Sequence, residues 1–281
     1  MNGSRRVTPQ EIADVLRERI RAGELKAGDR LPTQAELAEE FGVERGTIRQ
    51  ALRELLDDGL LSNASKGSPP RIAEPAPARD EPQAAMVGLA PRLTEAFSAK
   101  QVRIDVACHT AETLMVALGE SLRMIHEGRI RPETIDVRIL VPSRDINLAF
   151  PVPLEGDGDW VHQRWLAQRN AQGQVLRHNL LALRSTHGID VHVTFRALPF
   201  TPPVKLYLLN GEEALIGYYT LTKREEEWNS QTLHMYDALG LQSLLFSFVK
   251  RTSQRDAAFV KESQKWFDAL WETITSDLTL S

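Results

Sequence analysis

The most informative part of the chain is residues 31–61, which have the sequence LPTQAELAEEFGVERGTIRQALRELLDDGLL. Thr33 is followed three residues later by Glu36, which is the spacing of a capping box at the start of a helix. Gly42 predicts the end of that helix, because glycine readily adopts the positive φ that helix C-termini often need. A second helix is expected from about Glu44 to about Asp58, since apolar residues recur there at helical spacing.

Two helices joined by a glycine-containing turn are typical of a helix-turn-helix DNA-binding motif. In that motif the first residues of the second helix reach the base edges in the major groove. The residues expected to be exposed there are Arg45, Gly46, Thr47, Arg49 and Gln50. An ordinary helical hairpin with a solvated, charged face has the same spacing, so the pattern alone leaves both interpretations open.

The order of short motifs in this segment resembles the winged-helix DNA-binding domain of the GntR family of bacterial repressors. The matching motifs are Leu31-Pro32-Thr33, Glu36-Leu37-Ala38, Phe41-Gly42-Val43, Arg45-Gly46-Thr47-Ile48-Arg49-Gln50-Ala51-Leu52 and Gly59-Leu60-Leu61. The resemblance extends over about residues 7–72, and it implies that Arg45 and Arg49 contact DNA. The family usually has an arginine where this chain has Ala35. Either the operator differs at that position, or Thr33, Gln34 and the wing carry more of the binding.

The remainder of the first domain is predicted to be a helix followed, after the motif, by a wing. Thr8-Pro9 is a cap and first helical residue, and residues 62–73, SNASKGSPPRIA, have the turn-rich composition of a hairpin. In the winged-helix interpretation Lys66 and Gly67 lie at the tip of the wing, near the phosphate backbone or the minor groove. The alternative is a plain loop, and the prolines at positions 69 and 70 argue against a long second strand.

The composition indicates a globular chain with two domains. Its 281 residues exceed the usual size of one domain, and no apolar run reaches the ~18 residues of a membrane helix, so we expect no membrane partner and a cytoplasmic location. The single cysteine, Cys108, excludes an internal disulfide bond. The net charge of −4 does not by itself indicate a nucleic-acid partner, so the cations of a DNA-binding domain must gather on one face.

A proline-rich segment divides the chain. Residues 73–83, AEPAPARDEPQ, are predicted to be a linker between a winged helix-turn-helix domain of the α+β class (residues 1–72) and an effector-binding and dimerisation domain (residues 84–281). Strand and helix signals alternate in the second domain, which favours an α/β fold with a mainly parallel sheet. Helices are expected over 86–99, 110–127 and 160–187, strands over 102–107, 135–141, 189–198, 205–209 and 214–219, and a largely helical end that includes 241–249 and 257–274.

Residues 203–220, PVKLYLLNGEEALIGYYT, resemble the second half of the phospholipase D motif in a degenerate form. Pro203 stands where that family has its nucleophilic histidine, Lys205 keeps the lysine, and Gly217 keeps the glycine. The other positions differ: Asn210 replaces the aspartate, Tyr218 the serine and Thr220 the asparagine. Proline has no nucleophilic group, so the resemblance implies a phospholipase D-like domain without catalytic residues. The alternative is that these residues are simply two strands joined by a turn, with Lys205 reaching solvent.

Polar residues that follow the predicted strands are the candidates for an effector site. His109 and Thr110 follow the first strand and precede a helix, and Arg144 follows the second strand, which is where open α/β sheets bind ligands. With Lys205, Tyr218 and Thr220 they predict a site for a small effector, and an anion is one candidate for it. Each also has a structural explanation as a helix cap, a turn residue or a surface charge. The seven histidines lack zinc-site spacing, so we expect no metal and no cofactor.

These observations favour a sequence-specific transcriptional regulator, most naturally a repressor, that binds an inverted-repeat operator in double-stranded DNA as a homodimer. The alternative is a phosphodiesterase-like enzyme fused to a DNA-binding module, against which Pro203 argues. A third interpretation is a structural DNA-binding protein without an effector, which would not need so large a second domain.

Overall fold

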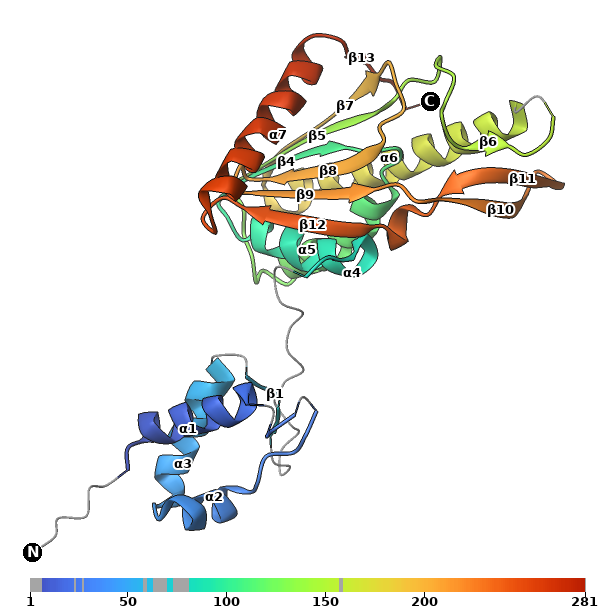
Figure 1. The fold of residues 1–281 in the computed structure, drawn as a ribbon. Coiled ribbons are helices and arrows are strands. Elements are labelled where there is room, and N and C mark those ends of the chain that lie inside the picture. The colour runs from blue at the N-terminus through green and yellow to red at the C-terminus, as the bar shows by residue number, and fades with distance from the viewer. Residues whose placement is uncertain are drawn as a thin grey trace, which may run out of the picture. The chain divides into compact units, whose positions relative to one another are not determined.

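The computed structural model describes residues 7–22, 24–26, 28–57, 60–62, 70–72, 81–156 and 159–280. The chain divides into two compact units, Met1–Arg79 and Asp80–Ser281, and each is described by itself (Figure 1). Most of the predicted linker, and the predicted wing tip with Lys66 and Gly67, lie outside the described residues.

The described residues of the first unit form three helices and a short strand pair. The helices are α1 (Pro9–Arg21), α2 (Gln34–Phe41) and α3 (Arg45–Asp57), and the antiparallel strands are β1 (Leu61–Ser62) and β2 (Arg71–Ile72). The predicted capping box is present, since Glu36 N–H donates to Thr33 Oγ1 and Thr33 N–H donates to the Glu36 carboxylate at 2.6 Å. Gly42 ends α2 in the left-handed region with φ 63°, as predicted. The strands are only two residues long, which agrees with the prolines before β2.

Apolar side chains from all three helices form the core of the first unit. Ile12 and Leu16 of α1 pack with Leu37 of α2 and with Ile48 and Leu55 of α3, and all five are almost completely buried. This packing directs the opposite face of α3 toward solvent, which is where a helix-turn-helix protein meets DNA.

The second unit is a mixed sheet of eight strands in the order β13-β7-β5-β4-β8-β9-β12-β3. The strands are β3 (Gln83–Ala84), β4 (Gln101–Ala107), β5 (Thr134–Pro142), β7 (Asp190–Leu198), β8 (Val204–Leu209), β9 (Glu213–Tyr218), β12 (Leu244–Val249) and β13 (Ser276–Asp277). Helices α4 (Ala85–Phe97), α5 (Glu112–His126) and α6 (Asp159–His187) pack on one face, and α7 (Gln254–Glu272) packs on the other (Figure 1). None of the described helices is long and apolar enough to span a membrane.

The expectation of a mainly parallel sheet was wrong. Only β4–β5 and β5–β7 pair in parallel, through the crossover helices α5 and α6, and the other neighbours in the sheet are antiparallel. The chain reverses tightly after β8, where Asn210 and Gly211 both have positive φ and join β8 to β9. Asn-Gly is a strong hairpin signal, and the simpler alternative of two strands joined by a turn is therefore confirmed for residues 204–218.

Two further differences lie near the C-terminus. Residues 244–249 form strand β12 rather than part of a helix, because this short apolar segment pairs with β9 and β3. Strands β10 (Leu221–Trp228) and β11 (Gln231–Ala238), which were not predicted, form a hairpin that pairs with β6 (Val152–Pro153) in a second, three-stranded sheet. Helix α7 agrees with the helix expected over 257–274.

Gly217 has a structural explanation in this fold. A Cβ atom at position 217 would lie 2.8 Å from the carbonyl oxygen of Leu244 on the neighbouring strand β12. Glycine is therefore required for close approach of the two backbones, and its presence does not indicate phosphodiesterase ancestry.

Candidate functional site

The exposed face of α3 carries a row of arginines. Arg45 and Arg49, as predicted, and Arg53, which was not singled out, are exposed and follow one another at four-residue spacing, so they lie on one side of the helix. No described residue forms an ion pair with any of the three. Gly46 and Gln50 lie beside Arg49 and Arg53 around a shallow hollow in the same surface. These guanidinium groups are therefore free to contact phosphates or the O6 and N7 atoms of guanine.

The start of α2 contributes polar groups to the first unit's surface. In the capping box the Thr33 hydroxyl accepts a hydrogen bond from the Glu36 backbone N–H. The return bond, from the Thr33 backbone N–H to the Glu36 carboxylate, is the main cause that lowers the pKa of that carboxyl group. Gln34 and Thr47 are half-buried, and Ala35 is exposed. Position 35 therefore faces solvent at the place where the family usually has an arginine.

Comparison with known proteins agrees with this geometry. Residues 8–68 match the family of bacterial regulatory proteins named gntR. Residues 8–68 are a GntR-family helix-turn-helix domain. The mannosyl-D-glycerate transport/metabolism system repressor MngR of Escherichia coli is 54% identical to the chain over 54 residues, which are 19% of this chain and 22% of MngR.

Two other relatives extend the comparison. The histidine utilization repressor of Klebsiella aerogenes is 30% identical over 166 residues, covering 56% of this chain and 63% of that repressor. The solved structure of YtrA from Sulfolobus acidocaldarius, a GntR-family transcription factor, is 36% identical and covers 26% of this chain and 76% of YtrA, with a TM-score of 0.23. The chain thus spans less than two thirds of the length of either curated repressor.

The second unit contains a buried row of aromatic rings where β4 ends. His109 is 5% exposed, and its ring centroid lies 4.9 Å from Phe150, 5.5 Å from Trp165 and 6.1 Å from Tyr219. The Tyr219 hydroxyl accepts a hydrogen bond from the His109 backbone N–H at 2.7 Å. Burial lowers the pKa of His109 to about 3, with a smaller contribution from the charge of Arg164, so its imidazole is neutral at pH 7.

Two buried arginines of α6 flank Trp165 and have different partners. The Arg164 guanidinium contacts the carboxylates of Glu226 on β10 and Asp237 on β11, so the hairpin supplies two counter-ions. Arg169 lies over the Trp165 ring, with its guanidinium carbon 5.1 Å from the ring centroid, and forms no ion pair with a described residue. Burial lowers the pKa of Arg169 to about 10, which leaves it charged at pH 7.

Of the predicted effector residues, His109 and Lys205 both lie against the Tyr219 ring. Lys205, on β8, is 1% exposed, and its ammonium group lies 5.1 Å from the centroid of the Tyr219 ring, which also contacts His109. The idea that this lysine reaches solvent was therefore wrong. Its Nζ donates to Thr113 Oγ1 at 3.3 Å and to the carbonyl oxygen of Gly240, and burial lowers its pKa to about 8.

The other predicted effector residues do not join this buried row. Tyr218 is 65% exposed and Thr220 is also exposed, because they end β9 and precede β10 at the surface. Thr110 is half-buried beside His109. Arg144 is exposed, although its backbone carbonyl contacts His162 Nε2 at 3.0 Å.

Trp165, Arg169 and Tyr219 were missed by sequence reasoning. A signal for the α6 residues was available, because position 169 follows Trp165 by four residues in the apolar stripe that includes Val161 and Leu176. A charged residue in such a stripe is buried, and it needs either a partner or a ligand.

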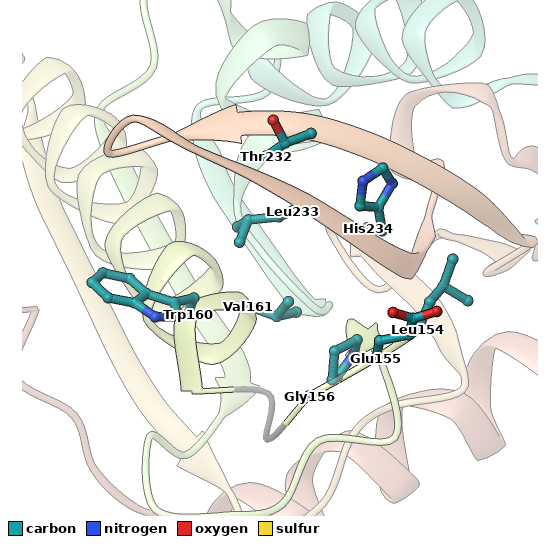
Figure 2. A pocket seen from close by; sticks show the side chains of 9 residues that line it. Leu154, Glu155, Gly156, Trp160, Val161, Thr232, Leu233 and His234 are labelled. Carbon is teal, nitrogen blue, oxygen red and sulfur yellow. The ribbon is translucent and has the colours of Figure 1, made fainter.

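A separate cavity of about 480 Å³ lies between α6, β11 and the segment after β6 (Figure 2). Figure 2 shows Trp160 and Val161 projecting from the helix, and Leu233 and His234 from the strand. None of the described residues that line it is a lysine or an arginine, so it does not suit an anion. Trp160 packs edge-on against Trp228 of the hairpin, with ring centroids 5.9 Å apart.

The residues behind the phospholipase D resemblance do not form a phosphate site. Lys205 is engaged by neutral oxygens inside the unit, Asn210 is a turn residue whose side chain bonds Arg103 N–H and the Ala96 carbonyl, and Gly217 serves strand packing. The resemblance is therefore unsupported. Among the residues that the structure describes, no group of three His, Cys, Asp or Glu side chains is placed to hold a metal ion.

Proposed function

We propose that this protein is a dimeric, sequence-specific transcriptional repressor whose second unit responds to a small effector. The observation that carries the proposal is the row of arginines at positions 45, 49 and 53 on the exposed face of α3, within a GntR domain, where no described residue forms an ion pair with them. Relatives that share this domain are named as repressors. Thr33, Gln34, Gly46 and Thr47 are proposed as further DNA contacts.

The proposed organisation assigns residues 1–72 to DNA binding, 73–83 to a linker and 84–281 to effector binding and dimerisation. The wing residues Lys66 and Gly67 complete the proposed interface. One winged helix contacts too few base pairs to select a single site in a genome, which favours a homodimer on an inverted repeat. Binding chromosomal DNA would place the protein in the cytoplasm. Phosphodiesterase activity is not proposed, because Pro203 supplies no nucleophile.

The proposal is tested by selecting genomic fragments that the purified full chain retains at physiological salt. Sequencing should yield a shared palindrome whose half-sites are separated by about one helical turn, or about 10 base pairs. Light scattering with and without a selected fragment measures the assembly state. A strictly monomeric protein would contradict the dimer, and the absence of any shared sequence would contradict specific recognition.

A further inference from the structure

Arg169 has hydrogen-bonding capacity that the protein does not use. Its Nη1 donates to the carbonyl oxygen of Pro142 at 2.7 Å, and its Nε and Nη2 donate to Asn170 Oδ1 at 3.1 and 2.9 Å. A guanidinium group has five N–H donors, so two remain after these three bonds. Both partners are neutral, whereas Arg164 on the same helix contacts two carboxylates. The charge of Asp145 favours this cation, but no described carboxylate forms an ion pair with it. A buried cation without a contacting counter-ion is costly, which favours an anion from outside the chain.

Further polar groups without partners lie on Trp165, which contacts Arg169, and on His109, which contacts Trp165. Three buried nitrogen atoms have no hydrogen-bond partner among the described residues: Nδ1 and Nε2 of His109, and the indole Nε1 of Trp165. The His109 and Trp165 rings are 5.5 Å apart, and Trp165 lies against Arg169. Buried polar groups are normally satisfied, so these three atoms have hydrogen-bonding capacity for a molecule that enters the unit.

Aromatic rings and a helix N-terminus surround this cluster. Phe150, from the loop between β5 and β6, packs on both His109 and Tyr219, at centroid distances of 4.9 and 5.4 Å. His109 lies three residues before α5, which begins at Glu112 and whose N-cap residue Ala111 provides no side-chain cap. Helix N-termini favour negative charge, and aromatic walls favour a planar molecule.

We propose that the second unit binds a flat carboxylate at this cluster, with the carboxylate on the free N–H groups of Arg169 and on His109, and its planar body against Trp165. The Phe150 side chain, which covers His109, moves aside when the ligand enters. This inference rests on the proposed function and deepens it, since it names the chemical class and the position of the effector.

The inference is tested by calorimetric titration of the full chain, without DNA, using benzoate as the probe and benzamide as its neutral counterpart. Wild type should bind benzoate saturably and at least about 10-fold more tightly than benzamide or inorganic phosphate. Arg169→Gln should weaken benzoate binding at least about 10-fold. Arg177→Gln removes the same charge from an exposed position of α6 and should bind as wild type does.

A second variant protects the test against misfolding of Arg169→Gln. His109→Gln leaves every hydrogen bond of Arg169 in place, and it should also weaken benzoate binding while thermal unfolding shows a folded protein. The inference is overturned if wild type shows no saturable benzoate binding, if benzamide or phosphate binds equally well, or if both folded variants bind benzoate as wild type does. The titration contains no DNA, so its result does not depend on operator binding. If wild type binds no operator, that result contradicts the proposed function and leaves the benzoate test unaffected.

Discussion

Replacing Arg49 with alanine is expected to weaken binding to the selected operator without unfolding the first unit. Arg49 is exposed and has no ion-pair partner among the described residues, so its removal leaves no buried group unsatisfied. An arginine that reads a guanine contributes about 1–3 kcal/mol of discrimination. Two symmetric copies in a dimer give about 2–6 kcal/mol, since distant sites contribute additively. Affinity should therefore fall at least about 30-fold.

The assay is fluorescence anisotropy of a labelled operator, titrated with protein at several salt concentrations. Arg53 follows Arg45 by eight residues, which is about 12 Å along α3. This length corresponds to three to four base-pair steps of DNA, each about 3.4 Å. An arginine that contacts phosphate should, when replaced by alanine, lower the salt slope by about 1 per contact, whereas a base-reading Arg49 should not.

A matched control is Arg177→Ala, which removes the same charge from an exposed position in the second unit. It should bind the operator as wild type does, and circular dichroism should show that Arg49→Ala retains the helical content of wild type. Operator affinity that is unchanged in both Arg45→Ala and Arg49→Ala would refute the assignment of α3 as the recognition helix.

Three further predictions concern the second unit, whose unfolding in denaturant is reported by tryptophan fluorescence because all five tryptophans lie in it. Asp105→Ala should cost about 3–5 kcal/mol, since it removes a buried carboxylate that accepts two bonds from Arg138, and an unchanged midpoint would contradict this. Burial holds the pKa of His109 near 3 in the folded protein, whereas its pKa is about 6.5 in the unfolded chain. As the pH falls from 7 to 5, the imidazole therefore becomes protonated in the unfolded state only. Wild type should therefore lose about 2 kcal/mol more than His109→Gln over that range, and equal losses would refute a buried neutral imidazole. Gly217→Ala should destabilise by about 1–3 kcal/mol through the clash with the neighbouring strand, whereas a neutral result would show that β12 shifts freely.

Much of the first unit is encoded locally, which is why its helices could be predicted. The capping box of Thr33 and Glu36 and the left-handed Gly42 depend on contacts within three or four residues, and both occur as expected. The four-residue spacing of Arg45 and Arg49 likewise determines that they share a helix face. Local geometry therefore also supplied the candidate DNA contacts in this part of the chain.

Strand direction in the second unit depended on pairing between distant residues. The segment 244–249 is apolar enough for either a helix or a strand, and its contacts with β9 and β3 select the strand. The alternation of strands and helices correctly indicated the parallel pairs around β5. It could not indicate that β8, β9 and β12 return antiparallel, because that depends on the turn at Asn210 and on the partners available in space.

In the candidate effector site, too, some features follow from position in the sequence and others only from tertiary packing. The position of His109 after a strand and before a helix was enough to place it at the end of the sheet. The different roles of Arg164 and Arg169 were not visible in the sequence, since both are arginines of one helix, five residues apart. Only the tertiary structure brings the carboxylates of the β10–β11 hairpin to Arg164 and leaves Arg169 with neutral oxygens, because a counter-ion is determined by what packs opposite a side chain and not by its neighbours along the chain.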